Sequence, residues 1–226
     1  PGYFGHIELA RPVFYIQYLP TIQKILHCVC FKCSKLLLNK EKFKQALKMD
    51  VQARWKYVHD LSKNIKRCGE DSEDGCQCLQ PKRIKKEGLA SLYAEWNGKD
   101  DNDENTTITI PLTPELVLKI FKRISDEDVT FMGFSPIWSR PDWMICQVLA
   151  VPPPAVRPSV KHDAQQRSED DLSHILVNII KYNKILQEKM QSNAAENVIN
   201  EWTNVLQYYV GRQVDNKIPG ANPVAQ

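Results

Sequence analysis

The stretch SEDDLSHILVNIIKYNKILQEKMQSNAAENVINEWTNVLQYYVG, residues 168–211, predicts two antiparallel helices joined by a polar tip. In each half, apolar residues recur at three- and four-residue steps, which is the spacing of one helix face. These residues are Leu172, Ile175, Ile179, Tyr182 and Leu186 in the first half and Ala195, Val198, Trp202, Val205 and Tyr209 in the second. Each apolar stripe is narrow, which suits two helices packed on each other. We therefore predict a projecting coiled coil, with Ser168 as its N-cap and Gly211 as its C-cap.

An ordinary hairpin in the core of a helical bundle would show the same periodicity. The preceding segment VPPPAVRPSVKHDAQQ, residues 151–166, favours the projecting hairpin. Its prolines predict an extended, semi-rigid loop, which a compact bundle does not need.

The rest of the chain predicts a mixture of helices and strands, so the expected fold class is α+β. The first strand is expected to break at Arg11-Pro12, because proline cannot donate to a strand ladder. Thr113 and Pro114 have the residue types of a helix N-cap and first turn. Helices are expected within residues 21–27, 40–61 and 113–124, and strands within residues 5–11, 84–96, 106–111 and 143–151, with extended or helical structure from Pro12 up to Pro20.

The composition of the 226 residues is that of a globular protein with one large domain or two small ones, and no apolar run approaches the roughly 20 residues of a membrane span. The chain begins without methionine, which suggests a piece of a longer protein. Residues 1–90 carry 17 Lys and Arg against 9 Asp and Glu, whereas residues 91–226 carry 13 against 18. A basic half beside an acidic half fits a nucleic-acid face, and equally a solvated basic face without a partner.

Seven cysteines without a secretory signal indicate metal binding rather than disulfides. Cys30 and Cys33 form a CxxC pair, whose tight turn suits a tetrahedral metal. A second pair is expected from the loop that holds Cys68, Cys76 and Cys78. A redox CxxC and buried inert cysteines are the alternatives, and the neighbouring His27 is a possible substitute ligand.

Basic residues bracket the CxxC pair and lie along the proline-rich segment. The six that we expect to contact nucleic acid are Lys24, Lys32, Lys35, Arg157, Lys161 and Arg167. Charges spread in this way favour phosphate contacts over base reading. No GxGxxG, Walker A, HExxH or GxSxG motif is present, and the five histidines are scattered, so no catalytic site is predicted.

Six collinear blocks carry a resemblance to a known family: GHIELARPVF (5–14), CVCFKCSKLLL (28–38), FKRISDED (121–128), SRPDWMI (139–145), VLAVPPPAVRPSV (148–160) and EDDLSHIL (169–176). Together they resemble the N-terminal clamp region of the largest subunit of DNA-directed RNA polymerases, of the eukaryotic RNA polymerase II type. The departures of this chain from the family's usual pattern suggest a divergent lineage or a viral polymerase. The resemblance covers nearly the whole chain.

The resemblance implies a structural zinc bound by Cys30, Cys33, Cys68 and Cys76. Cys76 rather than Cys78 is implied as the fourth ligand, because the family places this ligand four residues before a Gln-Pro pair, here residues 80–81. Tyr3 stands where the family has a histidine ligand of a second zinc. One zinc site is therefore expected.

The resemblance also implies the organisation of the chain. Residues 1–151 would form the clamp head and core, residues 152–167 the lid, residues 168–211 the clamp coiled coil, and residues 212–226 a linker toward the rudder. The Asp-rich motif that holds catalytic magnesium is absent from this sequence. We therefore expect a non-catalytic part of a nucleotidyltransferase.

The implied function is to close over DNA and the RNA–DNA hybrid during transcription, together with the other polymerase subunits. The tip of the coiled coil would dock initiation factors and a NusG-like elongation factor through Glu188, Lys189, Gln191 and Glu196. The expected location is the nucleus, or a cytoplasmic viral factory or virion for a viral member, with no membrane partner. The alternative is a stand-alone zinc-binding nucleic-acid or adaptor protein that uses the coiled coil as a docking arm.

Overall fold

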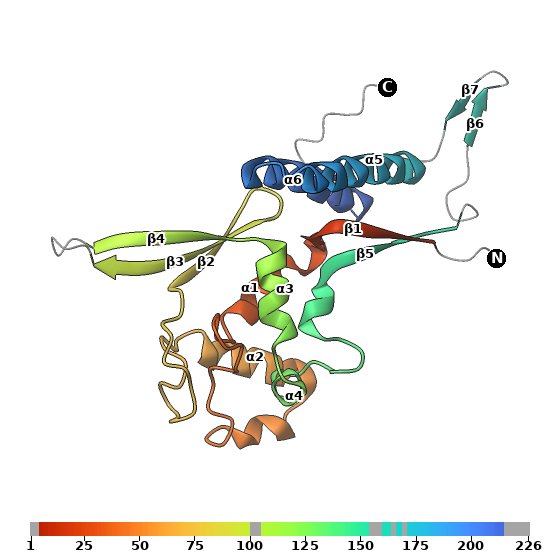
Figure 1. Ribbon diagram of the computed structural model, residues 1–226. Helices are drawn as coiled ribbons and strands as arrows, with labels where there is room; N and C mark the ends of the chain where they lie inside the picture. Colours follow the sequence, from red (N-terminus) through yellow and green to blue (C-terminus); the bar gives the residue numbers. More distant parts are fainter. Residues whose placement is uncertain (1–4, 100–104, 154–159, 164–165, 169–170, 215–226) are drawn as a thin grey trace. The chain divides into compact units, whose positions relative to one another are not determined.

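The computed structural model describes residues 5–99, 105–153, 160–163, 166–168 and 171–214 (Figure 1). The chain forms two compact units, which we call the central unit (residues 18–145) and the hairpin unit (residues 1–17 and 146–226). The mixture of helices and antiparallel strands confirms the predicted α+β class. None of the helices in the described ranges is both long and apolar enough to cross a membrane.

The central unit combines short helices with a three-stranded antiparallel sheet of order β2-β3-β4. Its helices are α1 (Leu19–Leu26), α2 (Val51–Ser62), α3 (Pro114–Lys122) and α4 (Asp126–Met132), and its 3-10 helices are η2 (Lys44–Lys48) and η3 (Pro141–Met144). A further 3-10 turn, η1 (Ile16–Tyr18), precedes α1. Its strands are β2 (Arg83–Glu87), β3 (Ser91–Lys99) and β4 (Asn105–Leu112).

The start of α3 confirms the predicted cap. Thr113 has extended backbone angles, and its side chain accepts a hydrogen bond from the backbone N–H of Leu116. Pro114 follows at the first helical position, where its missing N–H costs nothing. The apolar face of α3 is buried, with Ile120 and Phe121 almost fully enclosed.

Residues 40–61 do not form the single helix that their periodicity predicts. η2 ends at Lys48, and Asp50 has the extended backbone that precedes α2. The guanidinium of Arg54 donates hydrogen bonds to the carbonyls of Ala46, Leu47, Met49 and Thr130. Arg54 thus satisfies carbonyls that a continuous helix would have used, and the chain turns there instead.

A second unpredicted feature is α4, which begins directly after α3. Its N-cap is Ser125, whose side chain accepts from the N–H of Asp128 at 3.2 Å. It ends at Gly133 in the left-handed conformation, where a Cβ would lie 2.7 Å from the carbonyl oxygen of Val51. Only glycine fits so close to α2 with this backbone angle.

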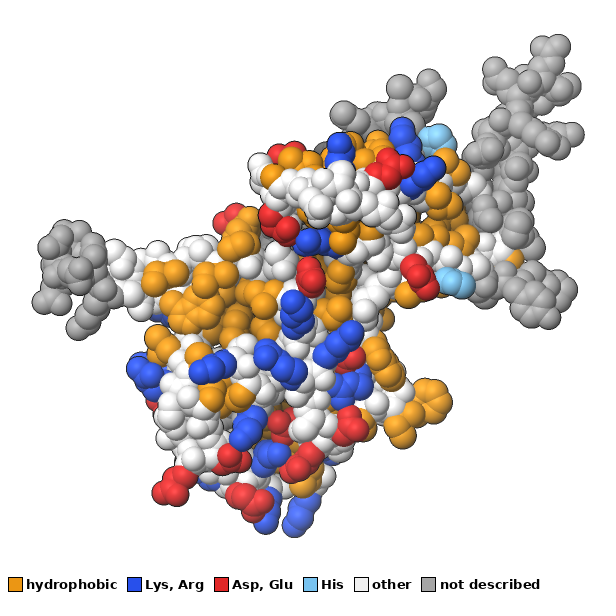
Figure 2. Space-filling view, viewed as in Figure 1, with side chains coloured by type: hydrophobic (Ala, Val, Ile, Leu, Met, Phe, Trp, Pro, Cys, Tyr) orange, Lys and Arg blue, Asp and Glu red, His pale blue; other side chains and the backbone are white. Residues whose placement is uncertain are grey.

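The surface of the central unit mixes charges of both signs, with hydrophobic side chains gathered over the region of the sheet (Figure 2). On β4, Ile108 and Ile110 are both exposed, whereas Leu112 is buried.

The hairpin unit packs two long helices on a two-stranded sheet of β1 and β5. Its elements are β1 (Gly5–Phe14), β5 (Ile145–Val151), the antiparallel strands β6 (Val160–Asp163) and β7 (Gln166–Ser168), and the helices α5 (Asp171–Gln191) and α6 (Glu196–Val214) (Figure 1). Its core takes Val13, Cys146 and Leu149 from the sheet, and Ile179 and Leu206 from the helices. The hairpin therefore packs on a sheet as well as on itself.

The buried face of α6 differs from the predicted stripe for this reason. Val198 and Val205 are only half-buried, while Ile199, Leu206 and Val210 are buried; Ala195 precedes α6 and is exposed. The buried face of α6 is turned toward β1 as well as toward α5, because the helix packs against both.

Two predicted caps are wrong. Ser168 lies in β7, and Gly211 is buried inside α6, which continues to Val214.

β1 runs through Pro12 without the predicted break. The N–H of Ala10 donates to Asn183 Oδ1 at 2.8 Å, and the N–H of Phe14 donates to Gln207 Oε1 at 2.6 Å. Pro12 lies between these residues on the same strand edge, because successive N–H groups alternate between edges. This edge faces helix side chains rather than a strand, so the missing proline N–H leaves the sheet intact.

Candidate functional site

A tight turn in the central unit holds the CxxC pair. Val29 and Leu36 form an antiparallel β-bridge on either side of it. The backbone N–H of Ser34 donates to the carbonyl of Cys30 at 2.9 Å, and Ser34 has a positive φ of 62°. The turn places Cys30 and Cys33 on the same side, as a metal-binding knuckle requires.

A second turn presents Cys68 and Cys76. The N–H of Gln77 donates to the carbonyl of Cys68 at 3.0 Å and closes the loop between the two cysteines. Gly69 and Gly75 cross within it so closely that a Cβ on Gly75 would lie 2.5 Å from the Gly69 backbone. Only glycine permits this crossing, so the glycines are part of the ligand geometry.

The four sulfur atoms of Cys30, Cys33, Cys68 and Cys76 all lie within 4.8 Å of one another. The Cys30–Cys76 sulfur distance is 3.5 Å and the Cys33–Cys68 distance is 3.6 Å. Metal–sulfur bonds of about 2.3 Å in a tetrahedron place the sulfurs about 3.8 Å apart. The cluster thus has the size of a tetrahedral thiolate site, and the cysteines are free rather than joined in disulfides.

The surroundings of Cys30 favour its thiolate. Burial raises the pKa of Cys30, but hydrogen bonds from the backbone N–H groups of Cys33 and Lys32 and from the side chains of Cys76 and Gln80 outweigh it. The pKa falls to about 7. The thiolate is the form that binds metal. Burial, together with the neighbouring Cys30, raises the pKa of Cys33 and of Cys68, so without a metal the negative charge of the cluster lies on Cys30.

Gln80 joins the two turns and was not identified from the sequence as part of the site. Its Nε2 donates to Cys30 Sγ at 3.2 Å and to the carbonyl of Cys78 at 2.9 Å, while its Oε1 accepts from the N–H of Phe31 at 3.1 Å. The side chain is buried. A glutamine next to a proline at the end of a cysteine loop was its only sequence signal.

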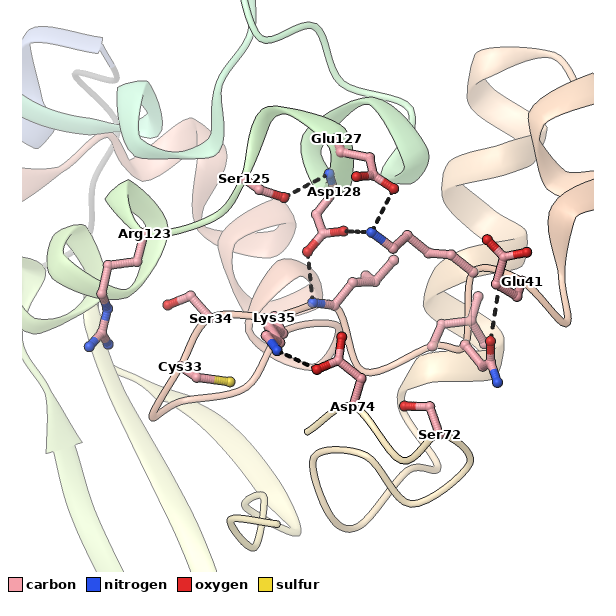
Figure 3. A pocket seen from close by; sticks show the side chains of 14 residues that line it. Cys33, Ser34, Lys35, Glu41, Ser72, Asp74, Arg123, Ser125, Glu127 and Asp128 are labelled. Atoms are coloured by element: carbon pink, nitrogen blue, oxygen red, sulfur yellow. Dashed lines mark hydrogen bonds and ion pairs between the residues drawn. The ribbon is translucent and has the colours of Figure 1, made fainter. Parts of the chain in front are cut away.

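A polar pocket of about 550 Å³ lies beside the CxxC turn and is organised by Asp128 (Figure 3). The Asp128 carboxylate accepts from the N–H of Leu36 at 3.1 Å and forms an ion pair with Lys40 at 2.7 Å. Lys40 also pairs with Glu127 at 2.9 Å. Asp128 thus ties the residues after the CxxC turn to α4.

The same turn is fixed at two more points. Ser34 Oγ donates to the carbonyl of Ile120 at 2.6 Å. Lys35 pairs with Asp74 at 2.8 Å (Figure 3). The first contact anchors the turn to α3, and the second links it to the loop between Cys68 and Cys76. The pocket is therefore an anchoring network, in which both lysines are paired with carboxylates.

The other thiols and His27 lie outside the four-sulfur cluster. Cys28 donates to the carbonyl of Lys24 at 3.3 Å, and burial raises its pKa to about 12. Burial also raises the pKa of Cys78. Cys146 is buried in the core of the hairpin unit, as predicted.

The predicted nucleic-acid contacts fall into different environments. Lys24 and Lys32 are exposed in the central unit, whereas Lys35 is engaged by Asp74. Lys161 and Arg167 are register partners across β6 and β7. Arg157 and Tyr3 lie outside the described residues.

The predicted docking residues lie at the turn between α5 and α6. Glu188 and Gln191 are exposed and Lys189 is half-buried. Glu196 instead forms an ion pair with Arg11 of β1 at 2.8 Å. Its carboxylate therefore has a partner within its own unit.

A family of known proteins matches the entire chain. The family model described as RNA polymerase Rpb1, domain 1, matches residues 1–226.

Proposed function

Because the chain belongs to the RNA polymerase Rpb1, domain 1, family and is thus part of the largest subunit of a DNA-directed RNA polymerase, we propose that it forms the non-catalytic clamp of that enzyme. In this role it closes over DNA and the RNA–DNA hybrid and keeps the transcribing complex together. The match across all 226 residues carries the proposal. It also favours the polymerase over a stand-alone adaptor protein.

The metal of the four-cysteine site is zinc in this proposal. Four thiolates in a tetrahedron suit structural zinc, which has no redox chemistry and takes four protein ligands in such sites. Bound by Cys30, Cys33, Cys68 and Cys76, zinc would join two turns that share few buried apolar side chains. The metal would stabilise the fold and would take no part in nucleotide addition.

The nucleic-acid contacts are made to phosphates, by Lys24 and Lys32 in the central unit and by Arg157, Lys161 and Arg167 in the lid, residues 152–167. Lys35 contributes less, because Asp74 already neutralises it at 2.8 Å. Contacts of this kind release counterions, so binding weakens steeply with salt and depends little on sequence.

The turn between α5 and α6 docks initiation factors and a NusG-like elongation factor in the nucleus, or at a viral transcription site for a viral member. The exposed polar side chains of Glu188 and Gln191 support this assignment. Lys189 completes the proposed surface. Glu196 would support it from the side through its ion pair with Arg11.

A photo-crosslinking experiment on the assembled polymerase tests the clamp assignment. A photoreactive amino acid replaces Lys32 in one variant and Lys119, an exposed residue of α3 without an assigned role, in another. With a DNA–RNA scaffold bound, position 32 is expected to crosslink to nucleic acid at low salt, and the crosslink should fade as salt rises. Equal crosslinking from both positions, or none from position 32, would contradict the proposal.

A further inference from the structure

A second pocket of the central unit is lined by basic side chains from three elements. It has a volume of about 470 Å³. Lys24 comes from α1 and His27 caps that helix, His59 comes from α2 and Lys63 caps it, and Lys82 precedes β2. The pocket is separate from the four-cysteine cluster, which shares none of these residues.

None of the described residues that line this pocket is acidic. The neighbouring carboxylate is Asp60, which lies 3.3 Å from Lys63 and 3.9 Å from His59 Nδ1. Lys24 and Lys82 have no ion-pair partner within the ranges that the structure describes. The pocket thus gathers three ammonium groups and two imidazoles against one exposed carboxylate at its edge.

The two imidazoles lie against each other and against the lysines. Their ring centroids are 6.4 Å apart. Burial lowers the pKa of His27, and the charges of His59 and Lys63 lower it further. Burial also lowers the pKa of His59, as do Lys24 and Lys63, while Asp60 acts in the opposite direction. An anion in the pocket would reverse these cationic effects, because it favours the charged imidazoles.

A plainer explanation covers only part of this arrangement. Lys24 and Lys63 lie at the C-terminal ends of α1 and α2, where cations complement the helix dipole. Lys82, however, belongs to no helix, and it faces the same pocket as both histidines. The convergence of three separate elements on one concavity therefore points to a ligand.

We propose that this pocket binds a phosphomonoester dianion. A nucleic-acid backbone spreads single charges along a groove, whereas these cations converge on one pocket that suits one doubly charged group. Ammonium groups bind phosphate as point charges, and the imidazole N–H groups add directional donors. The inference does not rest on the zinc or on the clamp function, and it assigns Lys24 to this pocket rather than to nucleic acid.

Lysine footprinting of the assembled polymerase tests the site. The protein is acetylated with a water-soluble reagent at constant ionic strength, and each lysine is quantified by mass spectrometry. Inorganic phosphate and a phosphoserine peptide are each expected to protect Lys24, Lys63 and Lys82 from acetylation. For a given anion, the three lysines should be half-protected at the same concentration. Lys56, an exposed lysine of α2 outside the pocket, should react equally with and without these anions.

Three further measurements decide which kind of anion binds. Dimethyl phosphate, a monoanionic diester, should protect at least tenfold more weakly than inorganic phosphate. Protection by the peptide at much lower concentration than by free phosphate would identify a phosphorylated side chain as the source, and equal midpoints a free small anion. The double variant Lys24→Gln/Lys82→Gln should lose protection of Lys63, whereas Lys56→Gln should keep it.

Sulfate reveals the contribution of the histidines to anion binding, because its own charge does not change between pH 6 and pH 8. Protonation of His27 and His59 at the lower pH should tighten sulfate protection, by at most about tenfold for each unit by which the anion raises an imidazole pKa. The variant His27→Gln/His59→Gln should lose this pH dependence and retain weaker protection.

Uniform protection of all exposed lysines would overturn the proposal, as would protection by nucleic acid but not by phosphate or phosphoserine. The second of these outcomes would leave the clamp function intact.

Discussion

The four-cysteine turns and the α5–α6 hairpin are stabilised in different ways. The turns contribute few buried apolar residues, chiefly Leu37 and the cysteines themselves, so they need four ligands and a metal to hold their shape. The hairpin buries a continuous row of apolar side chains and attaches to β1 through two amides. Loss of one metal ligand should therefore unfold the turns, whereas loss of one hairpin side chain should lower the free energy of unfolding only in part.

The largest effect is expected from loss of a metal ligand. Cys76→Ser should abolish stoichiometric zinc and unfold the two turns, because a structural zinc site contributes on the order of 10 kcal/mol to folding. Cys78→Ser is the matched control, since Cys78 lies in the same loop but outside the cluster. Metal analysis of the purified proteins should give one zinc for the control and none for Cys76→Ser. The opposite pattern would reassign the fourth ligand.

The next largest loss of stability is expected from the buried apolar residues of the α5–α6 hairpin. Leu206 is fully buried, so Leu206→Ala should lower the free energy of unfolding by about 2–5 kcal/mol. Trp202 is half-buried and stacks on Tyr182 with ring centroids 6.1 Å apart, so Trp202→Ala should cost less than Leu206→Ala. Urea unfolding of both variants provides the comparison. A larger loss of stability from Trp202→Ala would show that the stacked rings of Trp202 and Tyr182, rather than the buried apolar residues, hold the hairpin together.

A smaller effect is expected from the amide that joins α6 to β1. Gln207 accepts from the N–H of Phe14 at 2.6 Å and donates to its carbonyl at 2.9 Å. Gln207→Leu leaves both backbone groups buried without these partners, at a cost of about 1–3 kcal/mol. Hydrogen exchange at the Phe14 amide should accelerate in this variant. Exchange as slow as in the unchanged protein would show that another group protects this edge.

Local sequence patterns predicted the family, the fold class and part of the candidate site. The six sequence blocks identified the family, which the match over residues 1–226 confirms. The predicted α+β class and the capped start of α3 are likewise confirmed, because local patterns decide them. The four cysteines predicted as ligands converge in the structure.

Long-range contacts account for what the sequence did not predict. The rotation of α6 depends on β1, which lies far away in the chain. At the interruption of residues 40–61, Arg54 reaches three carbonyls of this segment and one of α4, and periodicity contains no sign of these contacts. Asn183 and Gln207 interrupt apolar stripes as polar residues, and only the backbone of β1 explains them.

The smallest effect on stability is expected at the turn between α5 and α6, where the functional effect should be largest. Glu188→Ala/Gln191→Ala removes two exposed side chains, so stability should change by less than about 0.5 kcal/mol per site. Glu196→Ala removes the ion pair with Arg11, but the carboxylate is 65% exposed, so the loss should stay below about 1 kcal/mol. If the turn docks a NusG-like factor, the double variant should lose factor binding in a pull-down with the assembled polymerase, whereas Asn204→Ala, at an exposed position of α6 away from the turn, should bind normally. Thermal unfolding of the same preparations separates the two effects. Normal factor binding by a stable double variant would mean that the factor docks elsewhere, and early unfolding would mean that these side chains hold the hairpin together.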